Sequence, residues 1–214
     1  MSDLPIIKYA SKGLDLHLRV ATGHFAAGNR HSNYFIDVAW PRARLSEARA
    51  IAENICAHYY TDTVVDTILC LDGTEVIGAC LAGALSKGDY INMNSHKTIY
   101  VITPEFVNGN QMLFRDNIVP MIAGKHVMVL SATISSGKMT ETAIQSVQYY
   151  GGTVTGVSAF FSAIKECEGI PVNSVFKPDD LPGYQNFAGH ECPMCKAGKK
   201  LDGLVNHFGC SMLR

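Results

Sequence analysis

Two stretches of this chain carry residues whose types and spacing suit chemistry. The first reads VMVLSATISSGKMTETAI, where an apolar run meets a Ser-Ser-Gly-Lys turn and a helical pattern then begins. Unpaired N–H groups and the helix dipole favour an anion at such a helix start. Gly137 permits close backbone approach and Lys138 adds a positive charge. The turn therefore predicts a phosphate-binding loop, with contacts from Thr133, Ser135, Ser136, Gly137, Lys138 and Met139.

Two other interpretations of this turn have to be weighed. The phosphate loop of P-loop NTPases needs a glycine where Ala132 stands and a serine or threonine where Met139 stands, so that class is rejected. The structural alternative is a Ser-Ser-Gly turn that only caps the following helix, because short polar side chains commonly cap helices.

The second stretch is the C-terminal GHECPMCKAGKKLDGLVNHFGCSMLR. Two thiolates separated by two residues, followed by a second pair of ligands, are typical of tetrahedral zinc sites. We therefore predict a structural zinc ion bound by Cys192, Cys195, His207 and Cys210, with His190 as an alternative to His207. Free thiols in a docked tail, or a disulfide between Cys192 and Cys195, are the competing interpretations. A thioredoxin-like redox role is weaker, because this motif does not open a helix after a strand.

Composition limits the class of protein. The chain has 214 residues, of which 47% are hydrophobic and 17% charged, as in a globular α/β domain with a core and a small appendage. A formal net charge of −1 offers no basic field for nucleic acid. Neither a secretory signal pattern nor an apolar run long enough for a bilayer is present. We expect a cytosolic protein without nucleic-acid or membrane partners. Four histidines are expected to be structural: His24, His58, His96 and His126.

Strand and helix patterns alternate along the middle of the chain. Buried strands are predicted at 67–71, 98–102, 127–132 and 153–161, and helices at 46–60, at 76–85 and from the turn at 135–138 to Gly151-Gly152. Repeated β-α-β units with apolar strands predict an α/β fold, a mostly parallel sheet with helices on both faces. In such sheets ligands gather at the carboxyl ends of strands, which here means the turns at 71–78 and 131–139.

The flanking segments have weaker patterns. We predict a helix over 9–21 and an antiparallel element within 25–40. Residues 103–125 form either a functional flap or an unrecognised hairpin. Everything after about residue 165 is turn-rich and is expected to form a tail. The predicted division is therefore a domain over 1–165 and a tail over 166–214.

Two segments together resemble a known family. GHFAAGNRHSNYFIDV (23–38) is similar to the N-terminal signature of orotate phosphoribosyltransferases, and VMVLSATISSGKMTETA resembles the phosphoribosyl-pyrophosphate motif of type I phosphoribosyltransferases. The resemblance covers roughly residues 5–165. It implies a parallel sheet with a small N-terminal hood, a homodimer, and a base pocket that includes Arg30, His31, Tyr34 and Phe35. Some orotate-type enzymes also end in a Cys-Pro-x-Cys segment.

The chain departs from this family at the groups that carry charge. Ser131 and Ala132 match the two acids that hold the ribose hydroxyls, and Arg115 is the basic residue kept in the flap. The loop that matches the pyrophosphate loop is acidic where the family has a lysine; its residues are Asp72, Gly73 and Thr74. Two lost hydrogen bonds from charged groups would remove about 3–6 kcal/mol of binding free energy.

These features predict a protein that binds a phosphorylated ribose or nucleotide with degraded or altered catalysis. One alternative is an active phosphoribosyltransferase of nucleotide metabolism with altered groups, in which first-loop carboxylates and phosphate oxygens hold Mg²⁺. The other is a non-catalytic, nucleotide-sensing regulator.

Overall fold

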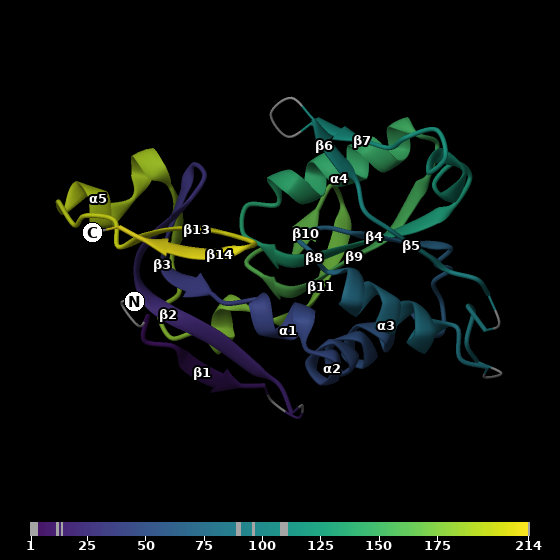
Figure 1. Ribbon diagram of the computed structural model, residues 1–214, viewed down its shortest axis with the longest axis horizontal. Coiled ribbons are helices and arrows are strands. Elements are labelled where there is room, and N and C mark those ends of the chain that lie inside the picture. The colour runs from purple at the N-terminus through teal and green to yellow at the C-terminus, as the bar shows by residue number, and fades with distance from the viewer. Residues whose placement is uncertain are drawn as a thin grey trace. The chain divides into compact units, whose positions relative to one another are not determined.

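The computed structural model describes residues 4–11, 13, 15–88, 91–95, 97–107 and 111–213. These residues form two compact units (Figure 1). The central unit comprises Pro41–Val175, and the terminal unit combines residues 4–40 with residues 176–213. This division differs from a boundary at residue 165, because the C-terminal segment pairs with the N-terminal strands, and pairing over such a distance leaves no local sequence pattern.

The central unit is built on a six-stranded sheet with the order β10-β11-β9-β8-β4-β5. Its parallel strands are β4 (Thr67–Cys70), β5 (Tyr100–Ile102), β8 (His126–Ile134) and β9 (Thr153–Ser162). Its edge carries an antiparallel hairpin of β10 (Glu166–Cys167) and β11 (Ile170–Phe176). All four residues of β4 are buried, as expected for a strand covered on both faces. The predicted mostly parallel sheet is confirmed.

Helices cover both faces of this sheet. The helices within the central unit are α2 (Leu45–Cys56), α3 (Glu75–Leu85) and α4 (Lys138–Tyr149); a short α1 (Ala39–Ala43) spans the boundary between the units, and another, α5 (Pro193–Lys196), lies in the terminal unit. Gly78 of α3 lies against Ile68 and Cys70 of β4. Leu69, which points to the opposite face of β4, belongs to the buried cluster that includes Ile144 of α4. The two helices therefore pack on opposite faces, as the sequence predicts.

The flap region is a hairpin. β6 (Glu105–Val107) pairs antiparallel with β7 (Gln111–Leu113) and is followed by a 3₁₀ helix, η1 (Val119–Met121). Residues 108–110 lie outside the described residues. Of the two alternatives for residues 103–125, the structure therefore contains the hairpin.

The terminal unit is a second sheet, with the order β12-β3-β2-β13-β14 and β1 paired with β2. Its strands are β1 (Ile7–Ala10), β2 (His17–Ala27), β3 (Arg30–Ile36), β12 (Asn186–Ala188), β13 (Gly203–Asn206) and β14 (Gly209–Met212). The helix predicted over 9–21 is wrong. Leu16, Leu18 and Val20 are buried while the residues between them are less so, which is the two-residue period of a strand.

The tail predicted after residue 165 is also more ordered than expected. β11 joins the central sheet, and β12, β13 and β14 join the terminal sheet, β13 pairing parallel with β2. Two 3₁₀ helices, η2 (Pro178–Asp180) and η3 (Gly189–Glu191), connect them. These strands have three to seven residues, too few for a periodic signal, and the partners of β12 and β13 in the N-terminal strands lie far away in the sequence. None of the helices described here has the length and hydropathy that a bilayer crossing requires.

Candidate functional site

The predicted phosphate turn lies between β8 and α4, at the carboxyl end of a central parallel strand. Gly137 is the N-cap of α4 and has φ of +79°, in the left-handed region that glycine adopts without strain. A Cβ atom at this position would stand 2.7 Å from Cδ1 of Ile164. The glycine is therefore required both by backbone conformation and by close packing.

Several donor groups at this turn have no acceptor among the described residues. Ser135 and Ser136 are exposed, Gly137 is buried, and within the described part of the chain the backbone N–H groups of residues 135–137 donate to no protein acceptor. The first helical bond of α4 runs from Glu141 N–H to the carbonyl of Gly137, and before it the N–H of Lys138 lies 3.5 Å from the hydroxyl oxygen of Ser136. The Lys138 ammonium lies 3.0 Å from the Glu141 carboxylate, and its side chain is 78% exposed. Thr133 and Met139 are half-buried at the edges of the turn.

The first loop, between β4 and α3, is a tight turn. Asp72 and Gly73 have φ of +56° and +76°. The Thr74 hydroxyl is buried and donates to the carbonyl of Leu71 at 2.8 Å, while the Arg42 guanidinium donates to the carbonyl of Asp72 at 2.7 Å. A non-glycine residue held at positive φ is uncommon, so the surrounding bonds must fix this conformation.

A carboxylate contacts β8 although the strand itself carries none. The hydroxyl of Ser131 donates to Oδ2 of Asp72 at 2.7 Å. Parallel pairing explains the contact, because Cys70, the last residue of β4, is in register with Leu130, so the loop after β4 begins beside Ser131 within β8. Ser131 and Ala132 are both buried, at 2% and 1% exposure. The structure thus brings two predicted residues, Asp72 and Ser131, together across neighbouring strands, which spacing along the sequence does not reveal.

The flap arginine is held in an ion pair. Nε and Nη2 of Arg115 each lie 2.7 Å from a carboxylate oxygen of Glu105, so the two residues form a bidentate bridge across the β6–β7 hairpin. The hydrogen bonds from Arg115 lower the pKa of the Glu105 carboxyl. Arg115 therefore already has an acidic partner on its own hairpin.

The residues predicted for a base pocket belong to β3, in the terminal unit. Arg30 donates to Oδ1 and to the carbonyl of Asn186, at 2.7 and 3.0 Å. The Tyr34 hydroxyl donates to the carbonyl of Pro182 at 2.8 Å. Phe35 is 7% exposed and packs against Phe25 with ring centroids 6.1 Å apart. Tyr34 and Phe35 are therefore core residues of this unit.

Four candidate metal ligands meet in the terminal unit. His24, His31, Cys192 and Cys195 have their ligand atoms within 4.8 Å of one another. His24 and Cys192 are fully buried, whereas Cys195 is exposed. Burial, and then the neighbouring His24, lower the pKa of His31, which favours its neutral, metal-binding form. This cluster could hold a metal ion.

The predicted ligand set is corrected by this cluster. Cys192 and Cys195 belong to it, but His207 and Cys210 do not. Nε2 of His190 lies 3.6 Å from Oε1 of Glu191, outside the cluster. Sequence reasoning treated His24 as structural and missed it. A signal was available, because His24 and His31 flank a Gly-Asn turn and an antiparallel hairpin brings such residues close together. His96, also expected to be structural, lies outside the described residues.

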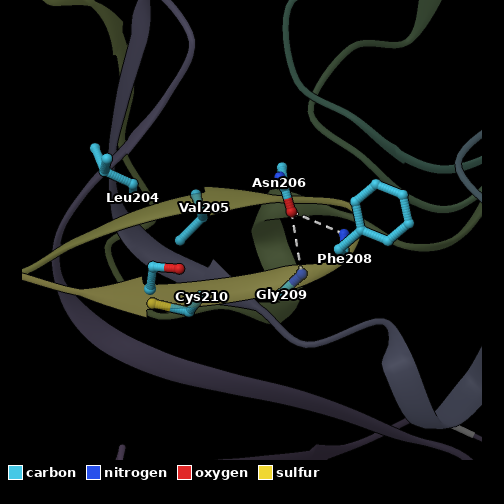
Figure 2. A pocket seen from close by; sticks show the side chains of 7 residues that line it. Leu204, Val205, Asn206, Phe208, Gly209 and Cys210 are labelled. Atoms are coloured by element: carbon cyan, nitrogen blue, oxygen red, sulfur yellow. Dashed lines mark hydrogen bonds between the residues drawn. The ribbon is translucent and has the colours of Figure 1, made fainter.

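His207 and Cys210 lie on the β13–β14 hairpin. Figure 2 shows Cys210 there and the Asn206 side chain, whose Oδ1 accepts the N–H groups of Phe208 and Gly209 at 2.9 and 3.2 Å. The hairpin lines a hollow of about 400 Å³. Sγ of Cys210 lies 3.7 Å from Sδ of Met212, and His207 packs against the ring of Phe208. The hydrogen bonds of Asn206 thus stabilise the turn between β13 and β14.

Two curated proteins that resemble this chain are both orotate phosphoribosyltransferases. The chain is 27% identical over 202 residues to the orotate phosphoribosyltransferase of Chlorobaculum parvum, covering 93% of this chain and 92% of the relative. It is 26% identical over 187 residues to the orotate phosphoribosyltransferase of Chlorobium phaeobacteroides, covering 84% and 86%. A search of protein-family models found no match.

Solved structures agree on the fold. Orotate phosphoribosyltransferase of Mycobacterium tuberculosis, in complex with Fe(III) dicitrate, superposes with a TM-score of 0.54 at 18% identity, covering 77% of this chain and 93% of that one. Adenine phosphoribosyltransferase of Leishmania donovani gives a TM-score of 0.53 at 15% identity, covering 71% and 73%. At these identities the likeness concerns the fold alone, which is that of the type I phosphoribosyltransferases.

Proposed function

We propose that this chain, which has the type I phosphoribosyltransferase fold and resembles orotate phosphoribosyltransferases in sequence, binds the phosphate of a phosphorylated ribose or nucleotide at residues 133–139, with degraded or altered catalysis. The observation that carries the proposal is the turn at residues 135–138. It opens a twelve-residue helix at the carboxyl end of a central parallel strand, and its residues Ser135, Ser136 and Lys138 are exposed.

The energetics of the turn suit a phosphate dianion. A hydrogen bond to a charged group contributes about 1.5–3 kcal/mol, so two such bonds give about 3–6 kcal/mol, or millimolar to tens of micromolar affinity. Lys138 is free to turn towards the anion at small cost, because an exposed ion pair such as that with Glu141 is worth only about 0–1 kcal/mol.

This chain lacks two sets of charged residues that the resemblance links to catalysis: the acids beside the ribose and most basic residues of the flap. Ser131 and Ala132 stand where the resemblance expects two acids, and the buried methyl of Ala132 offers no hydrogen bond. Arg115, the basic residue kept in the flap, is held by Glu105. A reaction that develops positive charge on the ribose and expels pyrophosphate depends on groups of opposite sign placed at both ends. These residues therefore support binding more strongly than turnover.

Calorimetric titration with ribose 5-phosphate and with phosphoribosyl pyrophosphate plus Mg²⁺ tests the binding. We expect saturable binding that Lys138→Ala weakens about 10–150-fold, the equivalent of one charged hydrogen bond. Lys87→Ala is the matched control, because Lys87 is also exposed in the central unit but follows the C-terminal end of α3. Absence of heat with either ligand, or equal affinity in both variants, would contradict the proposal.

The Asp72–Ser131 contact favours an active phosphoribosyltransferase as the second candidate. Through it, a carboxylate from the first loop contacts Ser131 of β8, one of the two positions where the resemblance expects acids. Incubation with phosphoribosyl pyrophosphate, Mg²⁺ and each pyrimidine or purine base, followed by chromatography, measures nucleotide formation. The second candidate requires turnover that Asp72→Asn abolishes while ribose 5-phosphate binding persists; no nucleotide from any base would eliminate it.

The proposal includes four features that rest on sequence and resemblance. They are cytosolic residence, a homodimer, Mg²⁺ if the protein turns over, and a structural zinc ion at Cys192 and Cys195. Sedimentation velocity checks the dimer, and a monomer at micromolar concentration would argue against it.

A further inference from the structure

The distances within the histidine–cysteine cluster fit one metal ion. In a tetrahedral zinc site, bonds of about 2.0–2.1 Å to nitrogen and 2.3 Å to sulfur separate the ligand atoms by about 3.3–3.8 Å. Nε2 of His24 lies 3.1 Å from Nδ1 of His31, 3.5 Å from Sγ of Cys192 and 3.6 Å from Sγ of Cys195. Sγ of Cys195 lies 3.2 Å from Nδ1 of His31. These four of the six pairwise separations fall within about 0.2 Å of the tetrahedral range, and all six lie within 4.8 Å.

The backbone aims His24 into this cluster. The pairing of β2 with β3 shifts register between Thr22 and Phe25, so a β-bulge interrupts the alternation of β2 at His24. A bulge re-aims a side chain and leaves the strand otherwise intact. Beyond it Ala26 pairs with His31, which places the second imidazole on the neighbouring strand.

Two backbone carbonyls of the C-terminal segment hold the His24 ring. Nδ1 lies 3.0 Å from the carbonyl of Lys199 and 3.2 Å from that of Lys200. A carbonyl only accepts, so Nδ1 carries the proton and the lone pair of Nε2 faces the cluster. Oδ2 of Asp202 accepts the backbone N–H of His24 at 2.6 Å. Fixing the tautomer through the other ring nitrogen is the usual arrangement of a metal-binding histidine.

The two cysteines form a compact knuckle. Cys192 precedes α5, and its carbonyl accepts the N–H of Lys196 at 3.1 Å. Two thiolates neutralise a divalent cation, which suits a site in which one cysteine and one histidine are fully buried. Two sulfur and two nitrogen ligands in tetrahedral arrangement favour zinc over metals that prefer oxygen.

Residues 189–200, which contain the two cysteines, bury few side chains. Among residues 189–200, Cys192 is the one buried residue. A segment without a hydrophobic core of its own needs another stabilising link, and in small domains a structural metal ion commonly provides it.

We propose that His24, His31, Cys192 and Cys195 bind one structural zinc ion that fastens the C-terminal segment to the β2–β3 hairpin of the terminal unit. Binding releases the two thiol protons to solvent as the Zn–S bonds form. The site is independent of the proposed phosphate site, since all four ligands lie in the terminal unit.

Metal analysis of the full chain tests this ligand set. Wild-type protein reconstituted with Zn²⁺ and desalted should retain one equivalent by mass spectrometry. Single substitutions His31→Ala and Cys195→Ser should lower zinc affinity at least about 100-fold in a competition with a chromophoric chelator, more than the 10–100-fold that loss of an outer-shell partner costs. Neither substitution empties the core, because Cys195 is exposed and His31 only half-buried.

Matched controls come from the same C-terminal segment. His207→Ala and Cys210→Ser should keep wild-type affinity, and Co²⁺ substitution should give a tetrahedral absorption spectrum that Cys195→Ser weakens. Zinc lost in Cys210→Ser but kept in His31→Ala would overturn the proposal. So would less than one equivalent in reduced wild-type protein whose circular dichroism shows it folded.

Discussion

Replacing Gly137 by alanine probes both the fold and the proposed phosphate site. Gly137 has φ of +79°, and its added Cβ would stand 2.7 Å from Cδ1 of Ile164. The variant therefore suffers two penalties: a left-handed conformation in a residue with a side chain, and a steric conflict in the packed core of the central unit.

The opposite end of the same helix provides the control. Gly151, just past α4, has φ of +80°, but a Cβ there meets nothing within 4 Å. Both variants pay about 1–2 kcal/mol for the left-handed conformation. The conflict with Ile164 adds an overpacking cost near the lower end of the usual 1–3 kcal/mol, because the end of that side chain can shift. We expect destabilisation of about 2–3 kcal/mol for Gly137→Ala and about 1–2 kcal/mol for Gly151→Ala.

Urea unfolding followed by far-ultraviolet circular dichroism measures the difference. The signal reports the central unit, since α2, α3 and α4 all lie there. A gap of about 1 kcal/mol separates the two midpoints by about 0.3–1 M urea at the usual slopes. Equal midpoints, or a lower midpoint for Gly151→Ala, would refute the packing argument. Ribose 5-phosphate binding should weaken in Gly137→Ala alone, and equal binding in both variants would count against the turn as the site.

Three further predictions concern the central unit. Tyr59→Phe removes the buried hydrogen bonds to the carbonyl of Val157 and to Ser158, and the half-buried bond from Asn173, and should cost about 1–3 kcal/mol of unfolding free energy in urea, whereas exposed Tyr149→Phe should cost nothing measurable. Burial raises the pKa of Asp66, but hydrogen bonds from His126 outweigh it and lower the pKa. The resulting stability is present above the unfolded carboxyl pKa of about 3.9 and is lost as pH falls through the lower folded pKa, so the advantage of wild type over Asp66→Asn in thermal melts should shrink progressively as pH falls below about 4, and an advantage that does not change with pH would contradict this. Burial raises the pKa of the Cys70 thiol to about 12, so iodoacetamide at about pH 8 should label it in urea and not in the folded protein; labelling of folded protein, by peptide mass spectrometry, would disprove this.

The sequence by itself determined the architecture of the central unit. Apolar runs such as residues 127–132, and the helical period after Lys138, are local signals, because burial on both faces and the 3.6-residue repeat each leave a mark within a few residues. The turn at residues 135–138 was predictable as a helix start for the same reason, since Ser135, Ser136 and Gly137 suit a helix start whatever surrounds them, and its phosphate role remains a proposal.

The terminal unit could not be derived in this way. The predicted helix over 9–21 failed because the two-residue period of Leu16, Leu18 and Val20 is that of a strand, and this segment pairs with β1 and β3. The β-structure after residue 176 depends on partners in β2 and β3, about 150 residues earlier, and a local pattern carries no information about them.

The same distinction separates the predicted from the observed sites. The spacing of Cys192 and Cys195 predicted a metal site. Their neighbours His24 and His31 are placed beside them by a β-bulge in β2 and by the hairpin to β3. The register of β4 with β8 likewise brought Asp72 to Ser131. Sequence fixes what each side chain can bind; strand pairing, which acts across the whole chain, decides which side chains meet.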